Sequence, residues 1–225
     1  MTTDPLTKIL SSAEAVLFDF DGPICSVFDG YPASQITREL LELARQLRGE
    51  LEPALEQASS PHDLLLAAAG DPELAQQLEV GLQKAELMAI ETARPTPGAA
   101  ESIAACTSSG RLVAIVSNNY SEAVTAYLAR AGLSEGVAHV EGRNPTDPTL
   151  MKPNPHLIER ATRALGIDPN SCVFIGDQTT DIEAGRASGL STIGYANKPG
   201  KMEALRAAGA NAVLTTMLAL AEAIA

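Results

Sequence analysis

The chain has 225 residues, enough for one sizeable core, and its 28 acidic against 16 basic residues give a net charge of -12. This acidic balance disfavours nucleic acid and anionic membranes as partners. No apolar run is long enough to cross a bilayer, and residues 1–5 lack the features of a signal peptide, so we expect a cytoplasmic protein.

The first predicted strand is an apolar run that starts at Val16 and ends in two carboxylates, Asp19 and Asp21. Side chains alternate along a strand, so both acids leave it on the same side, where Gly22 and Pro23 end the strand. Ligands bind at the carboxyl ends of parallel strands, and a carboxylate pair there suits a divalent cation and acid/base or nucleophilic chemistry. An acidic turn that merely closes a strand is the alternative.

A long helical segment follows, from about residue 34 to residue 92, without a convincing strand. Chain breakers divide it into helices over 37–48, 55–69 with an interruption near Pro61, and 72–91. We therefore expect a helical cap, residues 25–92, inserted into a core built from residues 1–24 and 93–225.

Strands and helices alternate after the proline-rich linker 93–98, which predicts a parallel, three-layer α/β sheet. The expected strands cover 112–116, 137–140, 172–175, 191–193 and an edge strand 212–214, and the expected helices cover 122–130, 156–165, 181–187, 202–208 and the C-terminal segment.

Polar residues follow the core strands in a way that points to one crevice. Ser117 and Asn118 end the strand 112–116, and Asp177 and Asp181 follow the strand at 172 to 176. Lys152 lies in a stiff, proline-bounded loop before a helix. Because parallel strands end on the same side of a sheet, we expect these polar side chains to lie close together. Taken singly, each has a structural interpretation: a helix N-cap, a turn residue or a solvated charge.

The order of these residues resembles the haloacid dehalogenase superfamily. Its four motifs match Asp19-Phe20-Asp21-Gly22, Ser117, Lys152, and Gly176-Asp177 with Asp181. The resemblance covers the whole chain and implies a Rossmann-like core with a cap inserted soon after the first strand. Pro23 stands where Thr or Val is more usual, a backbone position that should tolerate proline.

The resemblance also implies a role for each motif residue. Asp19 would be the nucleophile that forms an aspartyl-phosphate, Asp21 the general acid and base, and Lys152 the cation that neutralises Asp19 and the phosphate. Mg²⁺ is the implied cofactor. Its implied ligands are the side chains of Asp19, Asp177 and Asp181 and the backbone carbonyl of Asp21. The implied phosphate contacts are Ser117, the backbone N–H of Asn118, and Gly22. Asp181 would either ligate through water or orient Lys152.

Asp21 narrows the reaction class. Members that cleave carbon–halogen bonds lack this second Asp, so its presence points to phosphate monoesters. We expect a magnesium-dependent phosphatase acting on a small phosphorylated metabolite, similar to phosphoglycolate phosphatases. The alternatives are a phosphosugar mutase like β-phosphoglucomutase, or a non-catalytic binding protein. The cap shows no basic cluster beyond Arg38, Arg45 and Arg48, which favours hydrolysis.

Neither the cysteines nor the histidines form a disulfide or metal pattern. Their positions are Cys25, Cys106, Cys172, His62, His139 and His156. The sequence leaves the oligomeric state open between monomer and homodimer. It also leaves open whether several polar residues contact the leaving group or only shape loops: Asp29, Tyr31, Asn119, Arg143 and Asn144.

Overall fold

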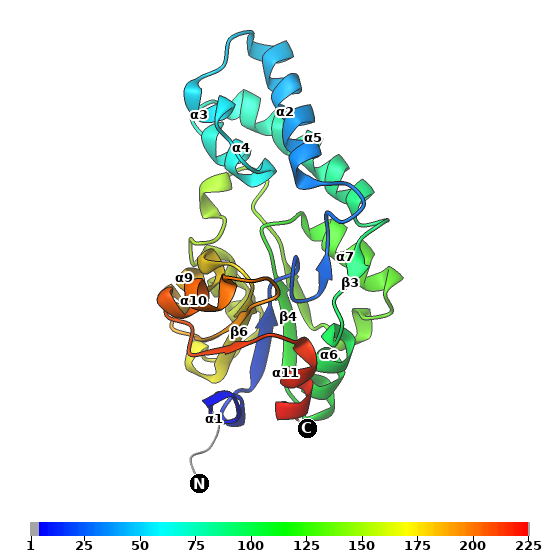
Figure 1. Cartoon of the computed structure of the whole chain (residues 1–225), viewed down its shortest axis with the longest axis vertical. Coiled ribbons are helices and arrows are strands. Elements are labelled where there is room, and N and C mark those ends of the chain that lie inside the picture. Colours follow the sequence, from blue (N-terminus) through cyan, green and yellow to red (C-terminus); the bar gives the residue numbers. More distant parts are fainter. Residues whose placement is uncertain (1–4, 225) are drawn as a thin grey trace.

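The computed structural model describes residues 5–224 and has a parallel six-stranded sheet at its centre (Figure 1). The strand order is β5-β4-β1-β6-β7-β8. The strands are β1 Ala15–Phe18, β4 Leu112–Val116, β5 His139–Glu141, β6 Cys172–Gly176, β7 Ser191–Tyr195 and β8 Ala212–Leu214. This topology confirms the predicted α/β core.

Strand β1 lies in the middle of the sheet, parallel to both of its neighbours, β4 and β6. Because parallel strands end at the same edge, the residues after β1, β4 and β6 meet there. Asp19 follows β1 directly, and its N–H donates to the carbonyl of Ile175 at 2.8 Å, which extends the ladder by one residue. The backbone of Asp19 is therefore held by the sheet.

Helices cover both faces of the sheet. Within β1, Val16 and Phe18 pack into one apolar cluster while Ala15 and Leu17 pack into another, as period-two alternation requires. The first face carries α1 Pro5–Ser11, α6 Ala99–Ser108, α7 Ser121–Arg130 and α11 Met217–Ile224, and the second carries α8 His156–Leu165, α9 Thr179–Ala187 and α10 Lys201–Ala207. Short 3-10 helices are η1 Ser134–Gly136, η2 Pro148–Leu150 and η3 Pro169–Ser171.

A group of four helices lies beyond one end of the sheet (Figure 1). They are α2 Ala33–Arg48, α3 Pro53–Glu56, α4 Pro61–Ala67 and α5 Pro72–Ala89. Their leucines form an apolar cluster separate from those of the sheet, and Met151 from the loop before Lys152 joins it. These four helices, called the cap helices below, are thus packed against one another and against that loop.

Local capping explains where two of the cap helices begin. The Ser60 side chain accepts from the N–H of Asp63 at 3.1 Å, and Asp71 accepts from the N–H of Leu74 at 3.1 Å. Each cap residue is followed by a proline at the first helical position. The segment predicted as one interrupted helix over 55–69 is therefore two helices, α3 and α4.

Two very short strands join the cap helices to the sheet. Strand β2 Cys25–Ser26 pairs antiparallel with β3 Arg94–Pro95, and Asp29 and Arg94 form an ion pair at 2.8 Å. Neither these strands nor α1 was predicted, because two-residue strands carry no periodic pattern. The pairing places both connections to the cap helices side by side. Within residues 5–224, no helix is both long and apolar enough to cross a membrane.

Candidate active site

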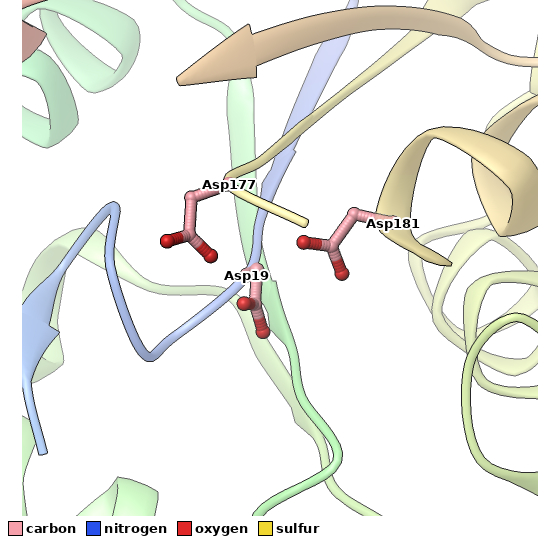
Figure 2. Close-up of side chains that lie close together, drawn as sticks. All are labelled: Asp19, Asp177 and Asp181. Atoms are coloured by element: carbon pink, nitrogen blue, oxygen red, sulfur yellow. The ribbon is translucent and has the colours of Figure 1, made fainter. Parts of the chain in front are cut away.

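Three buried carboxylates meet at the edge of the sheet where β1 and β6 end (Figure 2). Asp19 follows β1, Asp177 follows β6, and Asp181 lies in the first turn of α9. One oxygen atom from each of the three lies within 4.8 Å of the others. The structure thus brings together three of the four acids predicted as metal ligands.

Lys152 closes this cluster with all three of its ammonium hydrogens engaged. Its Nζ lies 2.7 Å from Asp19 Oδ1 and 2.7 Å from Asp181 Oδ1, and it donates to the carbonyl of Val116 at 3.1 Å. Burial lowers the pKa of Lys152, but the two carboxylates outweigh this effect and the pKa lies above its usual value. Lys152 is therefore a fixed cation beside Asp19.

Asp181 has both of its oxygens occupied. Oδ1 pairs with Lys152, and Oδ2 accepts from the N–H of Gln178 at 2.9 Å as part of a capping box at the start of α9. The capping interaction fixes the carboxylate, so Asp181 orients Lys152 in this structure.

Asp177 differs from Asp181, because only one of its two carboxylate oxygens is bonded among residues 5–224. Oδ2 forms an ion pair with Lys201 and accepts from Asn197 Nδ2 at 3.1 Å. Oδ1 is buried and has no hydrogen-bond partner among residues 5–224. Burial raises the pKa of Asp177, and the contact with Lys201 offsets this only in part. A buried carboxylate oxygen without a donor is costly unless a ligand completes it.

The donor set fits a hard divalent cation. Asp19 and Asp177 offer carboxylate oxygens within the distance noted above, and the unpartnered Oδ1 of Asp177 supplies a free lone pair. Mg²⁺ favours oxygen ligands and is commonly held by one or two carboxylates together with water and substrate phosphate. The residues present therefore match the cofactor expected from the sequence.

The two acids of the first motif have separate environments. Burial and the neighbouring Asp181 raise the pKa of Asp19 well above its usual range, against the lowering effect of Lys152. The side chain of Asp21 lies outside the carboxylate cluster and accepts from the N–H of Val27 at 2.9 Å. Burial raises the pKa of Asp21 as well, although this hydrogen bond opposes the shift. Asp21 as a metal ligand through its carbonyl stays a prediction.

Ser117 and Asn118 organise the loop after β4. Ser117 Oγ donates to Asn119 Oδ1 at 2.9 Å and accepts from the N–H of Asn119 at 3.1 Å. The Asn118 side chain accepts from the N–H of Lys152 at 2.8 Å and donates to its carbonyl at 3.2 Å. Asn118 thus ties the loop after β4 to the loop that carries Lys152.

Gly22 forms two backbone hydrogen bonds and lies so close to Asp177 that no side chain fits there. Its N–H donates to the carbonyl of Cys25 at 2.7 Å, and its carbonyl accepts from Thr96 Oγ1 at 2.6 Å. Its φ is +113°, and a Cβ placed there would lie 2.5 Å from Asp177 Cγ. Any larger residue would collide with the carboxylate. A phosphate contact by Gly22 stays a prediction, since both backbone groups already have partners.

A second buried charge cluster links the cap helices to the loops of the site. Arg143, fully buried, contacts Glu79 through Nε and Nη2 at 2.8 and 3.0 Å. Its Nη1 lies 2.8 Å from both oxygens of Glu86 and donates to the carbonyl of Asn118 at 3.0 Å. We call Glu79, Glu86 and Arg143 the arginine network. It joins α5 to the Ser117–Asn118 loop.

Glu86 has further donors from the same loop. Asn119 Nδ2 donates to Oε1 at 2.9 Å, and the N–H of Tyr120 donates to Oε2 at 3.1 Å. His62 Nε2, from α4, lies 3.6 Å from Oε1. Burial raises the pKa of Glu86, but Arg143 and His62 outweigh it and the pKa is lowered. Two residues left open by the sequence, Asn119 and Arg143, thus belong to this contact.

The other open residues lie away from the carboxylate cluster. Asp29 is exposed and pairs with Arg94, and the Tyr31 hydroxyl donates to Glu39. The Asn144 side chain accepts from the N–H of Thr146 at 2.9 Å. These contacts hold the connections to the cap helices and the loop after β5.

Sequence reasoning missed four side chains that shape the site: Glu79, Glu86, Asn197 and Lys201. A signal existed for the first two, because residues seven apart lie on one face of a helix, and this face of α5 also carries the buried Leu82. An acid on an apolar helix face needs a buried partner. Asn197 and Lys201 give no such signal, since they sit in a polar loop and at the start of a short helix.

The fold and this site define a class: a Rossmann-like α/β protein with a buried carboxylate cluster at the carboxyl ends of its parallel strands. A model of the haloacid dehalogenase-like hydrolases matches residues 13–189. The chain belongs to this hydrolase family, which confirms the resemblance seen in the sequence.

Individual relatives agree with the family. A phosphoglycolate phosphatase of Mesorhizobium japonicum is 31% identical over 44% of this chain, and that match spans 43% of the relative, less than half its length. An N-acetylmuramic acid 6-phosphate phosphatase of Pseudomonas aeruginosa is 29% identical over 80% of each chain.

Solved structures share the fold. The crystal structure of a predicted phosphatase from Clostridium acetobutylicum covers 94% of this chain and 98% of its own, with a TM-score of 0.75 and 18% identity. At this identity the likeness establishes the fold alone, and it confirms the predicted core architecture.

Proposed function

We propose that this hydrolase is a magnesium-dependent phosphatase that cleaves a small phosphate monoester through an aspartyl-phosphate. The observation that carries the proposal is Asp19, held at the end of the central strand beside the fixed ammonium of Lys152 and the oxygens of Asp177. The phosphatase names of relatives matched over most of their length support the same reaction class.

Asp19 is the proposed nucleophile. One carboxylate oxygen attacks phosphorus, the P–O bond to the leaving group breaks, and an aspartyl-phosphate forms. Lys152 pairs with Oδ1 of Asp19, which holds the carboxylate in one orientation and offsets its charge as the anionic phosphate approaches. Asp181 keeps Lys152 in place from the other side.

Asp21 is the proposed proton carrier. As an acid it protonates the leaving alkoxide, and as a base it then takes a proton from the water that attacks the aspartyl-phosphate. Its hydrogen bond to the N–H of Val27 fixes one carboxylate oxygen and leaves the other available for proton transfer. Burial raises the pKa of Asp21, which favours the protonated form that donates the proton.

Asp19, Asp177 and the carbonyl of Asp21 are the proposed holders of Mg²⁺. When bound, the cation screens the repulsion between the carboxylate nucleophile and the phosphate oxygens. Asp181 is proposed to act mainly on Lys152, since both of its oxygens are already bonded.

Ser117 and the N–H of Asn118 are the proposed phosphate contacts, placed at the end of β4 beside Asp19. Their loop is fixed on two sides, by Asn118 bonded to Lys152 and by Arg143 bonded to the Asn118 carbonyl. The backbone N–H of Asn118 is therefore fixed in advance and needs little reorganisation when phosphate binds, whereas Ser117 Oγ would turn its hydrogen from Asn119 to the phosphate.

Residues 25–92 are proposed to be the cap over this site and the determinant of the leaving group. Two cap arginines considered for a mutase are engaged within the cap: Arg45 pairs with Glu56, and Arg48 with Asp71 and Glu73. A mutase needs cap cations that reach a second phosphate, so this pairing favours hydrolysis.

We also propose a cytoplasmic enzyme that is monomeric or homodimeric. The three cysteines are free and buried, which suits a reducing compartment.

The test is phosphate release from a panel of phosphate monoesters with MgCl₂, including phosphoglycolate and N-acetylmuramic acid 6-phosphate. We expect selective release that vanishes in Asp19→Asn. Release by Asp19→Asn at the wild-type rate would refute the proposal. No release from any member would favour the mutase or binding alternatives, and a sugar-bisphosphate isomerisation assay would separate those two.

The magnesium requirement is tested by a separate experiment. EDTA should abolish phosphate release and added MgCl₂ should restore it, because Asp19 and the phosphate repel each other without a cation. Turnover unaffected by EDTA would remove magnesium from the proposal and leave the nucleophile assignment standing.

A further inference from the structure

Lys201 is a charged group that contacts the carboxylate cluster and that the proposed reaction does not use. It comes from the first residue of α10, and its ammonium is paired with Asp177 Oδ2. The Lys152 side chain is 3% exposed, whereas the Lys201 side chain is 19% exposed. Lys152 is locked in the interior, and Lys201 has a path to solvent.

The contact puts two cations in competition for one carboxylate. A divalent ion at Asp177 meets the positive charge of Lys201 a few ångströms away, and like charges at such distances repel strongly in a partly buried site. At the same time Lys201 offsets the cost of burying Asp177 before any metal arrives. One side chain therefore has opposite effects on the fold and on metal affinity.

We propose that Lys201 holds Asp177 in the metal-free enzyme and competes with Mg²⁺ for it, so that Lys201 sets the magnesium affinity of the site. On Mg²⁺ binding the ammonium moves toward solvent, and Asn197 continues to hold Oδ2 through its amide. Lys201 is a positioning residue that acts through Asp177. This inference rests on the proposed metal site.

The chain offers a matched control. Lys198 lies in the loop just before α10, and its exposed side chain makes no hydrogen bond or ion pair among residues 5–224. Its backbone carbonyl accepts from the N–H of Lys201, a contact that a side-chain substitution leaves in place. Lys198→Gln and Lys201→Gln remove the same charge from neighbouring positions, and only the second removes the contact with Asp177. Lys201→Arg keeps the charge and serves as the conservative rescue.

The experiment is titration of the wild-type protein and these three variants with MgCl₂ alone, without substrate, by calorimetry, together with Tm of each metal-free protein. We expect Lys201→Gln to bind Mg²⁺ roughly tenfold or more tightly. Its metal-free Tm should fall, because Asp177 loses its counter-charge. Lys198→Gln and Lys201→Arg should stay close to wild type in both measurements.

Other results would overturn the inference. Equal or weaker Mg²⁺ binding by Lys201→Gln would make Lys201 a structural or orienting residue, and equal tightening by Lys198→Gln would reduce the effect to general charge. If no protein binds Mg²⁺ and phosphate release is insensitive to EDTA, the proposed metal site itself fails, and the inference with it. This last outcome differs from the first two, in which the wild-type protein binds Mg²⁺.

Discussion

Two buried charge clusters lie on either side of the Ser117–Asn118 loop, and they differ in how completely their groups are bonded. In the arginine network every oxygen of Glu86 has two donors: Arg143 and Asn119 for Oε1, and Arg143 and Tyr120 for Oε2. In the carboxylate cluster Asp177 Oδ1 has none among residues 5–224. The first cluster is complete without a ligand, and the second is not.

The direction of each pKa shift follows from this difference. The pKa of Glu86 is lowered, because Arg143 and His62 outweigh burial. The pKa values of Asp19 and Asp177 are raised, because burial outweighs the lysines beside them. Buried charge that the fold leaves uncompensated is typical of functional sites, whereas the compensated charge of the arginine network joins α5 to the Ser117–Asn118 loop.

The largest effect is expected from Asp19→Asn. Removing the attacking oxygen should lower kcat by on the order of 10⁴-fold or more, as loss of a nucleophile does in other enzymes. Phosphate release with MgCl₂ measures it. Glu101→Gln, which removes an exposed carboxylate from α6, should keep the wild-type rate. A modest loss in Asp19→Asn would mean that another group attacks phosphorus.

Arg143→Met should be the most damaging change to stability. It leaves Glu79 and Glu86 buried without their cation, and breaking a buried ion pair in this way costs about 3–5 kcal/mol. Urea unfolding measures the loss. The same substitution at Arg45, whose pairing with Glu56 is on the surface of the cap helices, should leave the midpoint nearly unchanged. Equal effects at both positions would contradict the structural role of the arginine network.

Glu86→Gln tests the same network through pH. Glu86 has a folded pKa below its usual 4.5, so its charge stabilises the fold above that pH, and this stability is lost as the pH falls through the folded pKa. The difference in unfolding free energy between wild type and Glu86→Gln should therefore be full near about pH 7 and shrink below about pH 4.5. A difference independent of pH would show that the charge of Glu86 contributes nothing.

The smallest change in stability, and one of opposite sign, is expected from Asp177→Asn. Folding disfavours the charged form of Asp177, so a neutral side chain of the same shape should slightly stabilise the metal-free protein while abolishing magnesium binding. Tm with EDTA present measures this gain. A fall in Tm comparable to that of Arg143→Met would erase the contrast between the two clusters.

The core was largely predictable because its signals are local. Strands 112–116 and 212–214 and the helix 156–165 have the predicted bounds, since each combines an apolar pattern with clear breakers. Strands β2 and β3 were not predictable, because their pairing is between residues about seventy positions apart and each strand has only two residues.

The candidate site likewise has residues that the sequence could place together and contacts that it could not predict. Asp19, Lys152, Asp177 and Asp181 could be placed together from the sequence, because all follow strands or lie in the loop before α8, and parallel strands share one edge. The pairing of Arg143 with Glu79 and Glu86 spans 64 and 57 residues. It depends on how α5 packs against the loops at the end of the sheet, and the contact of Lys201 with Asp177 depends on how α10 packs beside β7. Tertiary packing decides both.

The most direct test of the central claim is to trap the phosphoryl group on the enzyme. Wild type and Asp21→Asn would be mixed with 4-nitrophenyl phosphate and MgCl₂, quenched in acid and mapped by peptide mass spectrometry. The good leaving group needs no acid, so Asp21→Asn should form the intermediate but hydrolyse it slowly, and phosphate should accumulate on Asp19. Phosphate on another residue, or continued turnover by Asp21→Asn with none bound, would contradict the account.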